Sequence, residues 1–193
     1  MENGKRYYGS INIYNVILYL MDFHSFRITF WNTLSASILG IIIYPIIQLI
    51  LTGHYLYIIM IVGILVTDLT TRFLKWISKT ESSSTPAFLR RPVDATDCNI
   101  LCTNGAQGGK SGMPSGHMAL VLFFITFVYM MQIHSLSSII HKFIFILFSI
   151  IYLSLVGYDR FRRKCHTFLQ VLSGSALGTI IGYIIALVFK SKL

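Results

Sequence analysis

The sequence predicts an all-α membrane protein, a multi-pass bundle of five to six helices, on three observations. Of the 193 residues, 54% are hydrophobic and 12% are charged, whereas a soluble domain carries about 25% charged residues. Residues 28–51, 143–158 and 167–189 contain no Asp, Glu, Lys or Arg. Helices built from such stretches are apolar on all sides, which excludes a soluble helical protein.

A helix of roughly 17 to 25 apolar residues crosses a bilayer. We therefore expect five spans, at residues 28–51, 55–77, 115–133, 140–158 and 167–189. Within the N-terminal residues 1–27, the segment Ile11–Met21 is short and contains two asparagines, so an interfacial helix is preferred over a sixth span. No repeat or linker is visible, and we expect residues 1–193 to form a single domain.

The second span ends in a stripe of charged side chains. Asp68, Arg72, Lys75 and Lys79 follow at intervals of four, three and four residues and share one helix face. Charges inside a membrane normally face the bundle or a water-filled site. Asp68 and Arg72 can form an ion pair, and Lys75 or Lys79 would point toward the following loop. The alternative for Lys79 is a lysine that snorkels to the lipid headgroups.

Residues 78–114 are expected to form an active-site loop, because polar loops of this length are uncommon and often functional. Its glycine-rich part, residues 105–112, is not a nucleotide-binding P-loop, since no strand precedes it and the spacing differs. Arg91-Pro92 offers a guanidinium that binds phosphate oxygens bidentately, on an extended backbone. Taken alone, Arg91 is better explained as a solvated loop charge.

The third span begins with Pro114-Ser115-Gly116-His117. Proline is tolerated at a helix start, and Ser115 is a natural N-cap. The free N–H groups of such a start form an anion site, next to which His117 would donate a proton. An ordinary capped helix is the alternative.

A second cluster precedes the last span. His166 and Gln170 lie four residues apart on one helix face, so Gln170 can fix the tautomer of His166 and leave one ring nitrogen free as a nucleophile. Arg160 lies just before them, among basic residues that also suit headgroup binding: Arg162, Arg163 and Lys164. The small residues Gly174, Gly178 and Gly182 permit close approach of a neighbouring helix, which we expect to hold His166 and Gln170 in place.

The net charge of +9 does not indicate nucleic-acid binding, because the basic residues flank the spans. With five spans, loops 78–114 and 159–166 share one membrane face with the N-terminus, and that face carries 13 of the 16 Lys and Arg residues. The positive-inside rule places that face in the cytoplasm, although catalytic cations would lie there in either orientation. Cys98 and Cys102 could pair if the loop faces an oxidising lumen, and Cys165 is expected to be a bystander.

Together these residues resemble the type 2 phosphatidic acid phosphatase (PAP2) superfamily, also called vanadium-haloperoxidase-like. The family pattern is Lys-x6-Arg-Pro, then Pro-Ser-Gly-His, then Ser-Arg-x5-His-x3-Asp. It is matched in order, across about residues 68–182, by Arg91-Pro92, residues 114–117 and Arg160-x5-His166.

Three positions depart from the pattern. Ser84 stands where the family has its lysine, Asp159 replaces the serine, and Gln170 replaces the aspartate. The glutamine and the glycines after it resemble the dolichyl diphosphatase branch, which removes a phosphate from a polyprenyl diphosphate in the endoplasmic reticulum. Since glutamine still selects the tautomer, we expect an active enzyme, and expect Gln170→Asp to retain activity.

The resemblance implies a phosphatase of lipid phosphates or diphosphates that needs no metal or other cofactor. His166 would attack the terminal phosphorus, and His117 would protonate the leaving oxygen. The phosphate oxygens would be bound by cations and a helix start: Arg91, Arg160, Ser115, Gly116, and Lys75 or Lys79. The expected partners are the lipid substrate and membrane lipids, without nucleic acid or an obligate protein partner, in the endoplasmic reticulum or a related internal membrane.

Three alternatives remain open. The substrate could be phosphatidate or another lipid monophosphate. The protein could be inactive and bind phospholipid headgroups through the same cations. It could also be a channel or transporter lined by Asp68 and Arg72, although no inverted repeat is visible.

Overall fold

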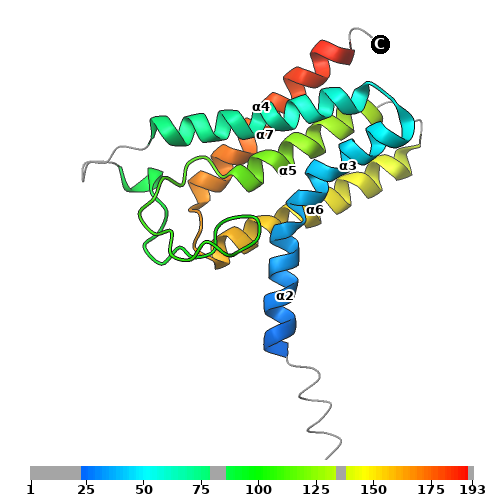
Figure 1. Ribbon diagram of the computed structural model, residues 1–193. Coiled ribbons are helices and arrows are strands. Elements are labelled where there is room, and N and C mark those ends of the chain that lie inside the picture. Colours follow the sequence, from blue (N-terminus) through cyan, green and yellow to red (C-terminus); the bar gives the residue numbers. More distant parts are fainter. Residues whose placement is uncertain (1–22, 79–85, 134–137, 191–193) are drawn as a thin grey trace, which may run out of the picture.

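The structure is a computed structural model that describes residues 23–78, 86–133 and 138–190. Both the expected interfacial segment Ile11–Met21 and Lys79 lie outside the described residues. The predicted all-α bundle is confirmed, with no strand within the described ranges. Figure 1 shows most of the helices gathered side by side, while the first, in blue, extends away from them. The α-helices are α2 (Phe23–Ala36), α3 (Ile38–Thr52), α4 (Leu56–Ile77), α5 (Gly116–Val128), α6 (Ile139–Arg162) and α7 (Phe168–Lys190).

Four segments of the described chain are long and apolar enough to cross a membrane: α4, α6, α7, and α5 with its π-helical continuation η2 (Tyr129–Ile133). Helices α2 and α3 make a fifth if counted together, with a bend of 43° between them. At the bend, the Ser37 hydroxyl donates to the carbonyl of Leu34 at 2.6 Å and contacts the Tyr152 hydroxyl on α6 at 2.7 Å. A serine that bonds back to its own helix competes with the regular ladder and bends it.

Helix α7 packs against α5 through its small residues, as the sequence predicts. A Cβ atom added at Gly174 or Gly178 would collide with the backbone of Ser115 or Ala119, respectively. One added at Gly182 would lie 2.9 Å from the carbonyl oxygen of Phe123. The start of α5 is also held directly, since the Ser115 N–H donates to the Gln170 carbonyl at 2.9 Å. This contact brings the His117 and His166 segments to the same end of the bundle.

The loop between α4 and α5 folds over that end, beside the start of α7 (Figure 1). It contains the 3-10 turn η1 (Ala87–Leu89) and two isolated bridges, Arg90 with Ser111 and Thr96 with Ala106. A disulfide joins Cys98 in this loop to Cys165, and Cys102 is free. The suggested Cys98–Cys102 pairing is therefore wrong, as is the bystander role of Cys165. Loop folding, which spacing does not reveal, sets the pairing.

Candidate active site

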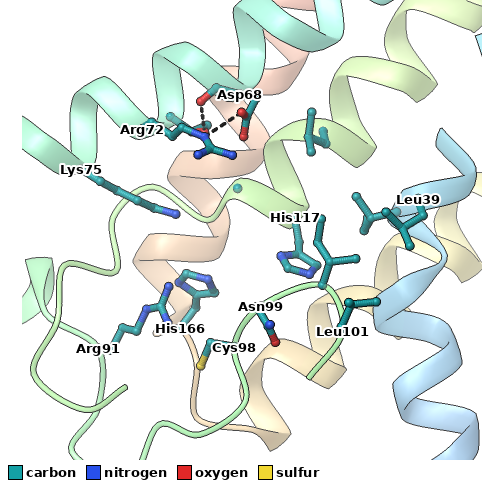
Figure 2. Close-up of a pocket in the computed structure, with 15 residues that line it drawn as sticks. Leu39, Asp68, Arg72, Lys75, Arg91, Cys98, Asn99, Leu101, His117 and His166 are labelled. Atoms are coloured by element: carbon teal, nitrogen blue, oxygen red, sulfur yellow. Dashed lines mark hydrogen bonds and ion pairs between the residues drawn. The ribbon is translucent and has the colours of Figure 1, made fainter. Parts of the chain in front are cut away.

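A cavity of about 490 Å³ opens between α4, the start of α5 and the loop. His117 and His166, 49 residues apart in sequence, both line it. Figure 2 shows Arg91 next to His166 and Lys75 on the α4 side, with Asp68 and Arg72 farther along α4. The structure thus brings together the two histidines and two of the predicted cations. The remaining lining is mostly apolar or from the loop: Ile38, Leu39, Thr71, Cys98, Asn99, Ile100, Leu101, Gly116 and Leu120.

Gln170 is fully buried, and its hydrogen bonds fix the tautomer of His166. Its amide nitrogen donates to the carbonyls of Phe88 and Arg90, both at 2.8 Å. Carbonyls only accept, so the amide oxygen must face the other way, where it accepts from the Thr167 N–H at 3.2 Å. That oxygen lies 3.3 Å from Nδ1 of His166. Nδ1 therefore carries the proton, and Nε2 keeps its lone pair.

His166 is only 3% exposed. Burial lowers the pKa of its imidazole well below the usual value of 6.5, and the nearby cations Lys75, Arg91 and Arg160 lower it further, while the bond to Gln170 opposes them. The ring is consequently neutral near pH 7. A neutral ring with a fixed tautomer is the form that acts as a nucleophile.

Arg91 presents unsatisfied donors beside the histidines. Its backbone is held by the loop, since the Arg91 N–H donates to the Lys110 carbonyl at 2.8 Å and the Gly109 N–H donates to the Arg91 carbonyl at 3.2 Å. Its Nε and Nη1 atoms are buried yet have no hydrogen-bond partner in the part of the chain that the structure describes. Buried donors without partners are costly, and an anion bound in the cavity would satisfy them.

Ser115 stands at the N-cap position of α5, but its side chain makes no capping bond. The predicted capping role is wrong, because the buried Ser115 hydroxyl has no hydrogen-bond partner among the described residues. The Ser115 N–H donates to the Gln170 carbonyl. The amides available for an anion therefore begin at Gly116, which lines the cavity. As for the predicted lysine, Lys75 reaches the cavity.

Arg160 does not line the cavity, although the sequence predicts that it binds phosphate. It is fully buried behind His117, because α6 continues past the predicted span end at residue 158 and carries Asp159 and Arg160 into the interior. Its Nη1 lies 3.2 Å from Nε2 of His117 and donates to the Cys98 carbonyl at 3.4 Å, and its Nη2 forms an ion pair with Asp159. The Nε atom has no hydrogen-bond partner within residues 23–78, 86–133 and 138–190.

Sequence reasoning missed three features of the site. Thr71 lies between Asp68 and Lys75 on the charged face of α4, and the spacing was sufficient to find it. Ser35, on α2, bonds to Arg160. It lies within three residues of Asn32, Thr33 and Ser37, so no local pattern distinguishes it from these polar neighbours. The disulfide next to His166 likewise has no signal in the sequence.

The residues of this cavity belong to a segment that matches a known protein family. The family model of the PAP2 superfamily matches residues 53–192, which covers every lining residue except Ile38 and Leu39. The chain matches no curated protein and no solved structure. The match extends over more than half of the chain, so it identifies the family and indicates a phosphatase of lipid phosphates. This membrane protein belongs to the PAP2 superfamily.

Proposed function

We propose that the protein is a membrane phosphatase that hydrolyses a polyprenyl diphosphate to the monophosphate through a phosphohistidine on His166. The observation that carries this proposal is the pair of histidines in one cavity, with Gln170 holding Nδ1 of His166 and leaving Nε2 free. A phosphatase of this kind in the endoplasmic reticulum or a related internal membrane fits the apolar spans.

The chemistry has two steps. In the first, the Nε2 lone pair of His166 forms a bond to the terminal phosphorus as the bond to the leaving oxygen breaks, and His117 gives that oxygen a proton. In the second, water attacks the phosphohistidine, His117 takes a proton from the water, and phosphate leaves. Both histidines then return to their starting protonation states.

Lys75 and Arg91 would bind the terminal phosphate. Positioning and charge stabilisation dominate phosphoryl transfer, and the unpartnered Nε and Nη1 of Arg91 are suitable donors. The first amides of α5, from Gly116 onward, add the positive end of a helix. Arg160 would not touch the phosphate and would act through its contact with His117.

Two features of the cavity support an isoprenoid diphosphate. Arg72, whose Nε donates to Asp68 at 2.7 Å, lines the cavity one turn before Lys75 and offers a cation for a second phosphate. At the other side the wall is apolar and includes Ile38, Leu39 and Leu120, where an isoprenoid chain would lie. A phosphate ester without a lipid tail would leave that wall unused.

Phosphate release from a panel of lipid phosphates and diphosphates, in detergent, tests the proposal. We expect turnover to be fastest on a polyprenyl diphosphate, to be abolished by His166→Ala, and to continue in EDTA. The matched control is His141→Ala, which removes an exposed histidine at the opposite end of α6.

Full activity of His166→Ala would refute the phosphohistidine. Turnover restricted to lipid monophosphates would instead refute the substrate and leave the mechanism standing. Loss of activity in EDTA, restored by a divalent metal, would refute the metal-free chemistry.

A further inference from the structure

Ser35 brings a helix that precedes the family-matched segment into the active site. It lies on α2, is 1% exposed, and contacts the site at three points. Its Oγ accepts from Nη2 of Arg160 at 2.6 Å, lies 3.4 Å from Nε2 of His117, and donates to the Asn99 carbonyl at 3.5 Å. These contacts use the full capacity of a hydroxyl, which has one donor and two acceptor sites.

The need for Ser35 follows from what surrounds Nε2 of His117. Arg160 lies 3.2 Å away, but a guanidinium only donates. It can bond to Nε2 only when that nitrogen carries a lone pair. Whenever Nε2 carries a proton, the acceptor within reach among the described residues is the Ser35 hydroxyl.

The proposed reaction requires such a state. The other nitrogen of His117, Nδ1, makes no hydrogen bond to any residue that the structure describes, so it is the one left to serve the substrate. If Nδ1 gives up a proton to the leaving oxygen, Nε2 must keep its own proton for the ring to end neutral.

We propose that Ser35 is a positioning residue for His117. Its hydroxyl accepts a hydrogen bond from the Nε2–H group through both steps, so that Nε2 keeps its proton and Nδ1 alone gives a proton to the leaving oxygen and takes one from water. The inference rests on the proposed function, since it concerns the acid of that reaction. It also gives α2 a role in catalysis that is separate from spanning the membrane.

The test compares substrates whose leaving oxygens differ in their need for a proton. A lipid monophosphate releases a strongly basic alkoxide, whereas p-nitrophenyl phosphate releases a weakly basic phenolate. The parameter is kcat/KM, which for this scheme reports formation of the phosphoenzyme. Ser35→Ala should lower kcat/KM on the lipid monophosphate by about tenfold, the value of one hydrogen bond to a charged group. On p-nitrophenyl phosphate it should change little.

Two further variants complete the design. Ser35→Thr keeps the hydroxyl and should restore activity on the lipid substrate. Ser37→Ala is the matched control, because its hydroxyl bonds to Leu34 and Tyr152 rather than to the site. Thermal unfolding in detergent verifies that each variant is folded.

An equal loss on both substrates would show that Ser35 only supports the structure and would overturn the inference. So would unchanged activity of Ser35→Ala, or the same substrate-dependent loss in Ser37→Ala. A wild-type protein inactive on polyprenyl diphosphate and on every phosphate ester would overturn the proposed function itself.

Discussion

Gln170 connects two parts of the site that arrive from different regions of the chain. Its amide oxygen accepts hydrogen bonds from Nδ1 of His166 and from the Thr167 N–H. Its amide nitrogen donates to the carbonyls of Phe88 and Arg90, just before Arg91. An aspartate accepts but does not donate, and it is one methylene shorter. The structure therefore replaces the expectation that Gln170→Asp retains activity.

We predict that Gln170→Asp loses most activity, because two buried carbonyls lose their donor at about 1–3 kcal/mol each. Gln170→Glu has the right length and keeps an acceptor for His166, so it isolates the loss of the donated bonds. Both variants should unfold at lower temperature, and Gln170→Glu should keep more phosphatase activity than Gln170→Asp. Wild-type activity and stability in Gln170→Asp would contradict this reading of the amide.

At the residue scale, the spacing of residues along the sequence predicted contacts within one helix turn. It failed where the contacting residue is distant in the sequence. The i, i+4 pair of His166 and Gln170 is confirmed by the 3.3 Å contact between Nδ1 and the amide oxygen. Ser115 was expected to cap α5 with its hydroxyl, but that hydroxyl makes no bond to the first turn of the helix. What holds the helix start is instead the Ser115 N–H, which donates to the carbonyl of Gln170, 55 residues later. That bond depends on how α7 docks, which no local pattern contains.

Among the helices, the packing of α7 on α5 determines whether the site assembles. The two helices approach so closely at Gly174 and Gly178 that no side-chain carbon fits between the backbones. The contacts lie directly beyond Ser115 and Gln170, so any separation of the helices also separates His117 from His166.

We predict that Gly178→Ala destabilises the protein, because the added carbon would collide with the backbone of Ala119. Overpacking of this kind costs roughly 1–3 kcal/mol. The matched control is Gly40→Ala on α3, where an added Cβ has no neighbour within 4 Å. Thermal unfolding in detergent should show a clear loss for Gly178→Ala and none for Gly40→Ala. Equal effects of the two substitutions would mean that the small-residue face does not set the packing.

Hydropathy predicted the helices well and their interruptions poorly. Predicted spans 55–77 and 167–189 agree with α4 and α7 to within one residue at each end. The first predicted span instead bends at Ser37, whose hydroxyl contacts Tyr152 on the distant helix α6. The fourth continues to Arg162, since the charge of Asp159 is balanced inside the protein by Arg160 and Arg163. An unpaired charged residue therefore marks the end of a span, whereas a charged residue that is paired inside the protein does not.

For the whole molecule, the disulfide and the distribution of charge indicate opposite orientations of the protein in the membrane. The face that holds the loops is rich in Lys and Arg, which favours the cytoplasm. Lys75 and Arg91 line the cavity, however, and Arg160 and Arg163 pair with Asp159 inside the fold. Cations placed for these reasons carry no information about insertion. A disulfide does, because such bonds persist in oxidising compartments and are rare in the cytosol.

We therefore predict that the active site faces the oxidising side of its membrane, with Cys98 bonded to Cys165 immediately before His166. In sealed vesicles whose cytosolic face points outward, a membrane-impermeant maleimide should label no thiol of this protein. After permeabilisation it should label Cys102, which is free and partly exposed, and only reductant should add Cys98 and Cys165.

Cys102→Ser is the control and should remain unlabelled until reductant is added. Since the bond fixes the loop beside His166, reduction should also lower phosphate release from wild-type protein. Labelling of all three cysteines in sealed vesicles without reductant would place the site in the cytoplasm and exclude the bond, and the positive-inside count would then be the correct guide.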